Sequence, residues 1–211
     1  MNKQPAFKLS RAEFEAGFSQ RQPDQAFAIL QTKTVGIAGL GGLGSNVALA
    51  LCRAGIGHLI LVDHDQVELS NLNRQQYNLT DLGKSKTQAL SAHLLQINPF
   101  LQLTTHNILL KPDNIGQIFP DANLLIEALD EASTKQMFIE TALLVFPDKT
   151  VIAASGLAGF GNFDQIKISR QGRLIVCGDQ QTDAKQTGLL APRVALVANL
   201  QADCALEVLL T

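Results

Sequence analysis

The sequence predicts an α/β fold with a doubly wound, mostly parallel sheet. Residues 34–46 read as an apolar, β-branched strand, a glycine turn and the start of a helix, which is the order of elements in nucleotide-binding folds. A second apolar strand, residues 59–62, ends at Asp63, which lies 19 positions after Gly44. A ribose-binding acid is expected about 20 residues after such a turn. Further strands alternate with helical stretches, so we expect a Rossmann-like core.

Each glycine of the turn has a physical role. Gly39 allows the tight turn, Gly41 lets the backbone approach a phosphate, and Gly44 lets the helix pack closely on the strand. Gly42 stands between Gly41 and Gly44 in the turn. The first turn of a helix offers free N–H groups and a partial positive charge, so this turn predicts an anion-binding site.

The bulk properties favour one domain over residues 1–211. A chain of 211 residues that is 46% hydrophobic can bury one sizeable core. We divide it into an N-terminal helical segment (1–32), a nucleotide-binding core (33–160), and a β-hairpin with a C-terminal helix (161–211). The net charge of −2 argues against broad binding to nucleic acid or membranes.

The cysteines and the N-terminal residues indicate the cellular compartment in which we expect the protein. The three cysteines, Cys52, Cys177 and Cys204, are far apart and form no Cys-x-x-Cys pair, which excludes a structural zinc of the four-cysteine kind within this chain. No apolar run is long enough to span a bilayer, and no signal-peptide core follows the polar N-terminus. We therefore expect a reduced, cytoplasmic protein.

The remaining elements follow from periodicity, capping and turn residues. Ser10 and Glu13 form a capping box for a first helix, and Pro192 suits the first turn of the last helix. We expect helices over residues 11–20, 23–31, 84–98, 115–119 and 132–146, and a last helix that residues 188–193 open and that ends at about residue 210. We expect strands over residues 101–105, 123–126 and 150–154, and a hairpin of 163–169 with 173–177 that turns at 171–172, followed by a polar loop over 180–187.

Polar residues gather where two of the predicted parallel strands end, which is where open α/β sheets bind ligands. After the second strand, Asp63 and Asp65 could hold a ribose and a metal ion, and Arg74 offers a fork of donors for a phosphate. Lys86, at the entrance of the next helix, can reach toward the glycine turn. Asp130 follows the strand 123–126; it could bind a ligand or simply cap the helix that begins at residue 132.

Four motifs together resemble a known family. They are Gly39-Leu-Gly-Gly-Leu-Gly-Ser45, Leu61-Val-Asp-His-Asp65 with Val67, Ser70-Asn-Leu-Asn-Arg-Gln75, and Gly83 with Lys86. This pattern is similar to the ThiF/MoeB/HesA group, which is related to the adenylation domains of ubiquitin-activating enzymes. Cys177-Gly-Asp179 and Gly188–Val194 resemble a compact ThiF subfamily linked to thiamine synthesis.

The resemblance implies ATP- and magnesium-dependent adenylation of the C-terminal glycine of a small ubiquitin-like sulfur carrier, ThiS in the ThiF case. It implies a homodimer, to which the apolar C-terminal helix also points. It implies nucleotide contacts from the glycine turn and from the residues Asp63, Asp65, Ser70, Asn71, Arg74, Gln75 and Lys86. Catalytic roles would fall to Arg74, Lys86 and Asp130, with Asp130 as the magnesium ligand.

The sequence departs from the family pattern in several places. Glu127 and Glu131 replace the family's Asp and Asn beside Asp130, and a longer acid at position 127 is expected to shift or weaken the metal contact. The zinc-binding cysteine pairs of larger members are absent. The family supplies an N-terminal arginine across the dimer, for which Arg11 and Arg21 are both candidates. Cys177 is either the cysteine that some members join to the carrier or an ordinary buried residue.

Two other functions stay open at this point. The glycine turn and Asp63 alone would also suit an NAD-dependent oxidoreductase, although Arg74 and Lys86 suit a triphosphate better. The second alternative is a non-catalytic module that binds a ubiquitin-like partner, which Glu127 and Glu131 leave open. Nucleotide preference and pyrophosphate exchange separate these possibilities.

Overall fold

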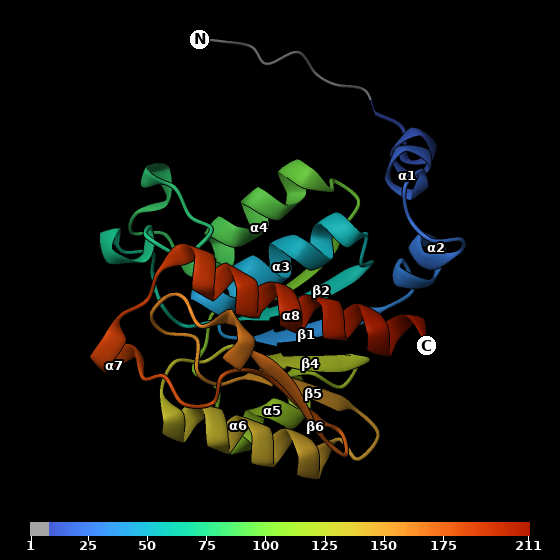
Figure 1. Cartoon of the computed structure of the whole chain (residues 1–211). Helices are drawn as coiled ribbons and strands as arrows, with labels where there is room; N and C mark the ends of the chain where they lie inside the picture. Colours follow the sequence, from blue (N-terminus) through green and yellow to red (C-terminus); the bar gives the residue numbers. More distant parts are fainter. Residues whose placement is uncertain (1–8) are drawn as a thin grey trace.

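The computed structural model describes residues 9–211 and arranges seven strands in one sheet, in the order β3-β2-β1-β4-β5-β7-β6 (Figure 1). Neighbouring strands are parallel except for the antiparallel pair of β6 and β7. The predicted doubly wound, mostly parallel sheet is therefore confirmed. The strands are β1 (Thr34–Ala38), β2 (His58–Val62), β3 (Gln102–His106), β4 (Leu124–Glu127), β5 (Thr150–Ala154), β6 (Lys167–Gln171) and β7 (Leu174–Gly178).

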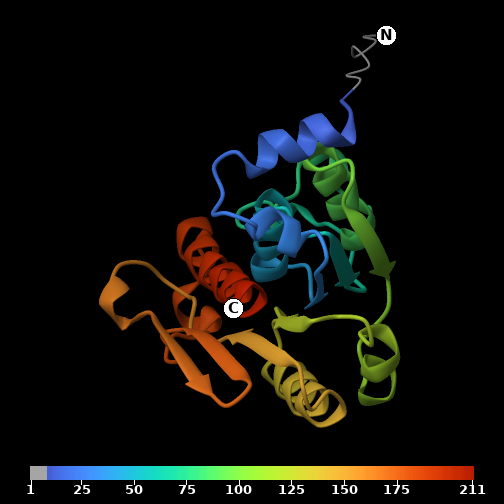
Figure 2. The same ribbon diagram turned by 90° about the vertical axis from the view of Figure 1, so that its right-hand side faces the viewer.

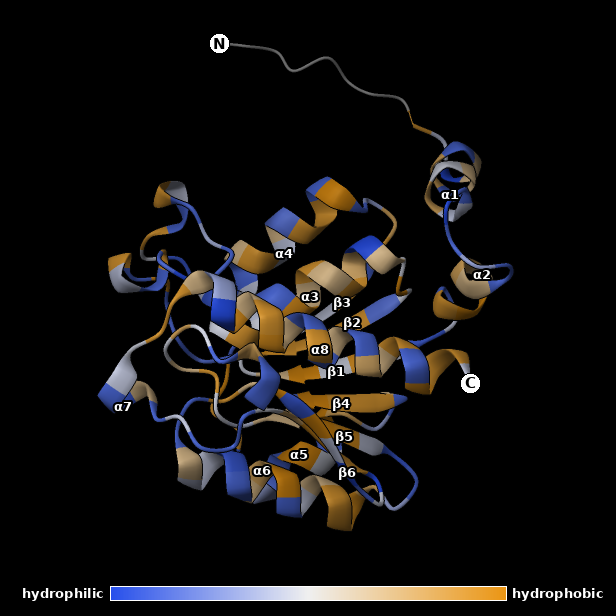
Figure 3. Ribbon diagram, in the orientation of Figure 1, coloured by the Kyte–Doolittle hydropathy of each residue, from blue (hydrophilic) through white to orange (hydrophobic). Residues whose placement is uncertain are grey.

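Helices cover both faces of the sheet, and the buried apolar residues form one cluster on each face (Figures 1 and 3). One face is covered by α3 (Gly42–Ala54), α4 (Lys86–Ile97) and α8 (Ala191–Leu210). The other is covered by α5 (Pro112–Ile118) and α6 (Ala132–Val145). The strands β1, β2, β4 and β5 are almost wholly buried because they lie between these layers.

The strand order creates one crevice. From β1 the chain winds outward through β2 and β3 on one side, and β4 and β5 lie on the other side of β1. The connections therefore leave in opposite directions from β1 and β4, which makes the carboxyl ends of these two strands the topological switch point. The glycine turn follows β1 and the acidic loop of residues 127–131 follows β4, so both predicted polar regions reach this point.

The N-terminal helices α1 (Arg11–Ser19) and α2 (Ala26–Leu30) lie at one end of the molecule (Figure 2). Ser10 and Glu13 form the expected capping box. Phe14 stacks on Phe18 and meets Phe100, which follows α4, so aromatic contacts attach α1 to the core. The first eight residues of the predicted 1–32 segment lie outside the described residues. Among the helices of residues 9–211, none is long and apolar enough to cross a membrane.

Several predicted boundaries were wrong. The helix expected over 23–31 is confined to α2, because Gln25 adopts a left-handed conformation with φ 67°. The first hairpin strand begins at Lys167, since residues 163–165 form a short 3₁₀ turn, and the chain turns at Gly172 and Arg173. The polar loop 180–187 contains a short helix, α7 (Ala184–Thr187), which Asp183 caps. The hairpin also extends the main sheet, since β7 pairs with β5.

The helix α8 uses its apolar residues within its own chain. Five of the residues that suggested a dimer from the sequence are buried against α3 and the sheet: Val194, Val197, Ala198, Ala205 and Leu209. The broad apolar face of this helix therefore reflects contact with both a helix and a sheet. It supplies no separate argument for a second subunit.

The close packing of the glycine turn leads to a prediction about stability. A Cβ at position 44 would come within 1.9 Å of the Gly39 carbonyl oxygen, which is backbone and cannot give way. Gly44→Ala should lower the free energy of unfolding by about 1–3 kcal/mol or more, which is the usual cost of inserting a group into a closely packed site. Gly17→Ala is the control, because nothing lies within 4 Å of its added Cβ and alanine favours a helix. Urea denaturation measures the free energy of unfolding of both variants and of the wild type. A Gly44→Ala variant as stable as Gly17→Ala would contradict the packing argument.

Candidate functional site

A cavity of about 530 Å³ opens at the switch point. Its wall includes Gly39, Gly41 and Gly42 of the glycine turn, and α3 begins at Gly42 with no side-chain cap. This helix starts four residues earlier than Asn46, where the sequence suggested regular helix, so the last glycines form its first turn. Uncapped N–H groups therefore face the cavity, with the positive end of the helix behind them.

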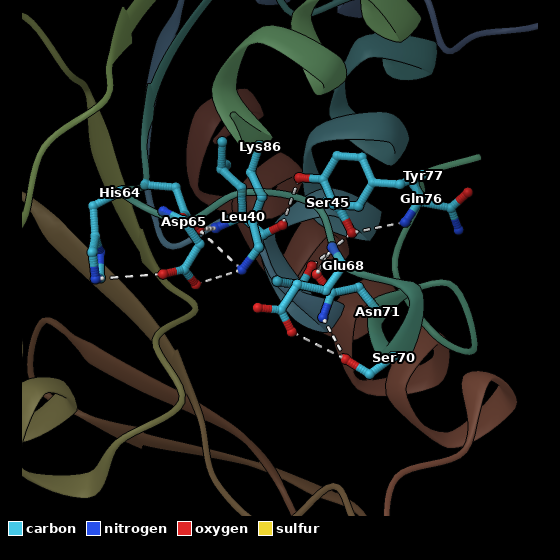
Figure 4. Close-up of polar contacts among 12 residues, drawn as sticks. Leu40, Ser45, His64, Asp65, Glu68, Ser70, Asn71, Gln76, Tyr77 and Lys86 are labelled. Carbon is cyan, nitrogen blue, oxygen red and sulfur yellow. Dashed lines mark hydrogen bonds and ion pairs between the residues drawn. The ribbon is translucent and has the colours of Figure 1, made fainter. Parts of the chain in front are cut away.

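Asp63, Asp65 and Lys86 form a connected group beside the turn. Figure 4 shows Asp65 and Lys86 pointing toward each other. Asp63 is buried and accepts hydrogen bonds from the N–H groups of Leu40 (2.6 Å) and Asp65 (2.8 Å). Lys86 Nζ lies 2.7 Å from Asp65 Oδ2 and 3.9 Å from Asp63 Oδ2. Asp63 thus joins the ends of β1 and β2, and the buried Lys86 carries a positive charge to the cavity wall.

Arg74 lies on the other side of the glycine turn. Its Nη1 donates to Ser70 O (3.1 Å) and to Asn73 Oδ1 (2.7 Å), while its Nε and Nη2 have no hydrogen bond with any of residues 9–211. Asn46, on α3, fixes the backbone of this loop by donating from Nδ2 to Arg74 O (3.2 Å). Arg74 is therefore held at the cavity with donors left for a ligand.

The loop after β4 brings acids to the same cavity. Asp130 and Glu131 line the cavity. Asp130 is exposed and has neither a hydrogen bond nor an ion pair with the rest of residues 9–211. It does not cap α6, whose N-cap position is Glu131, without a side-chain cap bond. The capping role considered for Asp130 was therefore wrong, and its carboxylate is free for a ligand.

Glu127 lies behind this loop, away from the cavity wall. It is fully buried, and its two carboxylate oxygens each lie 2.8 Å from Lys135 Nζ. Burial raises the pKa of Glu127, although the charge of Lys135 and its hydrogen bonds act in the opposite direction. Because Lys135 already occupies both oxygens, the longer acid at this position does not lie where it would bind a metal ion in the cavity.

The carboxylates differ in how well they suit a cation. Ligand atoms of Asp63, His64 and Asp65 lie within 4.8 Å of one another. However, Lys86 neutralises Asp65, and Asp63 accepts two backbone N–H groups. Asp130 has neither kind of partner, so it is the acid of this site that best fits a magnesium ion, which prefers one or two carboxylates with phosphate oxygens and water.

The structure brings most of the predicted residues to one cavity and leaves others outside its wall. Those on the wall are Gly39, Gly41, Gly42, Asp63, Asp65, Arg74, Gln75, Lys86 and Asp130. Gly44 packs beneath the turn. Ser70 and Asn71 contact each other and Glu68 (Figure 4), and Asn71 Oδ1 accepts the Glu68 N–H at 3.0 Å. These two residues therefore shape the loop that carries Arg74.

Cys177 lies away from the cavity, in the core between β7 and α8. It is fully buried, and its Sγ lies 4.0 Å from that of Cys204. Burial raises the pKa of Cys177 to about 12, which disfavours the thiolate needed for a nucleophile. Of the two roles that the sequence left open for Cys177, the geometry favours the ordinary buried residue.

Three further residues of the cavity wall escaped the sequence analysis or received no detailed role in it. Lys135 lines the cavity but lies in no motif that we recognised, and His64 lines it from within the Leu61–Asp65 motif, where we gave it no role. Gln75 was expected to touch a nucleotide, and its buried Oε1 has no hydrogen-bond partner among the described residues. A buried amide oxygen on a cavity wall is available to a donor of a ligand.

The loop that follows β7 forms another part of the wall, through Thr182, Asp183 and Ala184. Asp179 holds this loop by accepting the N–H of Thr182 at 2.8 Å, and it lies 3.7 Å from the buried guanidinium of Arg193 on α8. In the Cys-Gly-Asp sequence of residues 177–179, Cys177 thus belongs to the buried end of β7, and Asp179 anchors the loop that follows.

Comparisons with known proteins agree with this geometry. The chain is 29% identical over 187 residues to the adenylyltransferase and sulfurtransferase uba4 of Ogataea parapolymorpha, covering 85% of this chain and 48% of that protein. It is 32% identical over 195 residues to the protein of the same name in Emericella nidulans, covering 85% of this chain and 40% of the relative. The chain thus spans less than half the length of these relatives.

Among solved structures, the fold matches the tRNA N6-threonylcarbamoyladenosine dehydratase TcdA of E. coli, in a complex with ATP. The TM-score is 0.84 at 21% identity, over 95% of this chain and 96% of the other. The model of the ThiF family matches residues 18–211, a span that includes the C-terminal hairpin and helix. The chain therefore belongs to the ThiF family.

Proposed function

We propose that this protein uses ATP and Mg²⁺ to adenylate the C-terminal carboxylate of a small ubiquitin-like carrier protein. The observation that carries the proposal is the composition of one cavity. An uncapped helix N-terminus, Arg74 and Lys86 supply positive potential for a triphosphate, and Asp130 supplies a free carboxylate for a cation. The names of relatives that are 29–32% identical to the chain, all adenylyltransferases, support the same reaction.

The reaction needs charge neutralisation more than acid–base chemistry. A carboxylate oxygen of the carrier forms a bond to the α-phosphorus, and the bond to the bridging oxygen breaks, so that pyrophosphate leaves with the electron pair. Negative charge grows on the phosphate oxygens, where fixed donors are most effective. Arg74 has two unpaired donor groups, Nε and Nη2, among residues 9–211, and Lys86 can turn from Asp65 toward the triphosphate.

The surroundings of Asp63 favour ATP over NAD. In dinucleotide-binding folds this acid binds ribose hydroxyls. Here Asp63 accepts two backbone N–H groups and lies 3.9 Å from Lys86, although each oxygen keeps a second lone pair. A lysine beside the ribose acid, with Arg74 across the turn, adds more positive charge than a pyrophosphate bridge requires. The oxidoreductase alternative is therefore the weaker one.

Magnesium fits the acid side of the cavity. Asp130 would hold the ion, which would supply positive charge to offset the charge that grows on the leaving pyrophosphate. Within the class of ubiquitin-like carriers we propose a ThiS-like protein of thiamine thiazole synthesis, on the resemblance of residues 177–179 and 188–194. The names of the relatives, adenylyltransferase and sulfurtransferase, specify no carrier, so candidate carriers must be compared directly.

We also propose a homodimer, on the family resemblance and on two exposed aromatic residues near the site, Phe160 (82% exposed) and Phe163 (66%). Of the two candidate arginines, Arg11 already pairs with Glu15 at 2.7 Å, whereas Arg21 has no ion pair in the described part of the chain. We therefore propose Arg21 as the one offered across the dimer. Light scattering at micromolar concentration should give twice the 22.7 kDa of one chain, and a monomer mass would count against this.

The activity is tested by pyrophosphate exchange in the presence of ATP, Mg²⁺ and candidate carriers. We expect exchange that depends on a carrier with a free C-terminal glycine, and Arg74→Ala should reduce it by about 10²–10³, the loss of one transition-state donor. Arg53→Ala is the matched control, because Arg53 is exposed at the far end of α3. Carrier binding without exchange would support the non-catalytic module instead, and a higher melting temperature with NAD but not with ATP would support the oxidoreductase.

Asp130→Asn tests the acid assigned to magnesium. Asp130 is exposed, has no partner in residues 9–211 and caps no helix, so the variant should melt at the wild-type temperature. Its exchange activity should fall by about 10²–10³, with a higher magnesium requirement, because the amide lacks the charge that holds the cation. Asp148→Asn, at an exposed position without partners in the described chain, should leave both properties unchanged. Wild-type activity of Asp130→Asn at limiting magnesium would refute the assignment.

A further inference from the structure

The buried ion pair of Glu127 and Lys135 surrounds one peptide of the loop that carries Asp130. The Leu129 N–H donates to Glu127 Oε1 at 2.7 Å. The Leu129 carbonyl oxygen accepts from Lys135 Nζ at 3.0 Å. Both polar backbone groups of Leu129 are thus bound by the two members of the pair, which are themselves joined by contacts of 2.8 Å.

The geometry accounts for every donor of the lysine. An ammonium group has three N–H donors, and those of Lys135 reach Glu127 Oε1, Glu127 Oε2 and Leu129 O. Glu127 is fully buried, and the Lys135 side chain is 20% exposed. Such a pair is weak evidence for added stability, because desolvation offsets much of the attraction. The position of the ion pair in the fold points to a role other than stability.

That position is directly before Asp130. The strand β4 ends at Glu127, and α6 begins only at Ala132, with no side-chain cap at Glu131. On the strand side, the Ala128 N–H donates to Ala38 O at 2.8 Å, which ties the loop to β1. Between this bond and Glu131, whose carbonyl oxygen accepts from Thr134 Oγ1 at 2.8 Å, the side-chain contacts that fix the backbone in the described chain come from Glu127 and Lys135.

We propose that Glu127 and Lys135 are positioning residues, which hold the Leu129 peptide so that the Asp130 carboxylate faces the phosphates of the bound nucleotide. This inference rests on the proposed function and deepens it. It assigns Glu127 a role other than metal ligation, since the ammonium group of Lys135 occupies the places on both oxygens that a cation would take. Partners that orient a metal ligand typically affect metal affinity or activity by about 10–100-fold.

The test separates positioning from stability with the double variant Glu127→Gln/Lys135→Met in the full chain. Gln keeps an acceptor for the Leu129 N–H, and Met keeps the length of the lysine stem without its charge. Replacing both charges together leaves no unpaired buried ion, so we expect a melting temperature close to that of the wild type. The single variant Lys135→Met leaves the Glu127 carboxylate buried without a counter-charge. Its melting temperature should therefore be lower than that of the wild type.

The decisive readout is calorimetric binding of Mg²⁺ to the protein with α,β-methylene-ATP, which needs no turnover. We expect the double variant to bind Mg²⁺ about 10–100-fold more weakly than the wild type, and its magnesium requirement in pyrophosphate exchange to rise in parallel. Lys149→Met is the control, because Lys149 also donates to a carbonyl, Phe119 O at 2.8 Å, but outside the cavity wall. Wild-type Mg²⁺ binding by the stable double variant would overturn the inference.

Lys135→Arg provides the second variant if the double variant does not fold. A guanidinium can pair with both Glu127 oxygens, but its donors have fixed directions in one plane, so we expect its contact with Leu129 O to differ from that of the rotatable ammonium group. It should keep the melting temperature and still weaken Mg²⁺ binding, and unchanged binding would contradict the proposal. If the wild type itself binds no nucleotide and catalyses no exchange, both the proposed function and this inference are refuted. Wild-type activity with unaffected variants refutes the inference alone.

Discussion

The site depends on a close backbone approach between the glycine turn and the loop after β4. Gly39 has φ 89°, and a Cβ there would meet the Ala128 carbonyl oxygen at 2.6 Å. Only glycine tolerates both conditions. The approach brings the positive end of α3 and the acids Asp130 and Glu131 to the wall of the same cavity. A wider separation would leave the anion-binding and cation-binding groups too far apart to act on one triphosphate.

Two ion pairs at the site differ in how easily they can be exchanged for a ligand. Lys86 pairs with Asp65, whose side chain is 48% exposed, whereas Lys135 pairs with Glu127, which is fully buried. An exposed partner is exchanged for a phosphate at low cost because water already solvates it, but a buried one is not. Lys86 is therefore suited to move between partners, and Lys135 to stay in place. Arg74 needs no exchange, because two of its donor groups are unpaired among residues 9–211.

The sheet and the site were largely predictable because they depend on local patterns. Strand burial, the glycine spacing and the acids after β2 and β4 each leave a signal within a few residues. The features that were not predicted depend on contacts between residues that are distant in sequence. Nothing in the sequence around Lys135 indicates that it pairs with Glu127, and burial of Cys177 follows from α8 packing over β7. The role of Asp130 as a helix cap failed for a different reason: the helix begins at Ala132, as expected, but its N-cap position is Glu131, and Asp130 lies one residue before that position.

The helix α8 has a consequence for the order in which this protein can fold. It covers the sheet face formed by β5 and β7 and packs along α3, and its buried residues belong to the larger apolar cluster. That cluster also contains residues of β1 and α3, which leave the ribosome far earlier. The first half of the chain therefore emerges with an uncovered apolar face, which stays open until residues 191–210 follow. Long-range closure of this kind is slow and exposes hydrophobic surface in the meantime. The helix α8 thus completes the core, because it covers an apolar face that would otherwise be open to association with other chains.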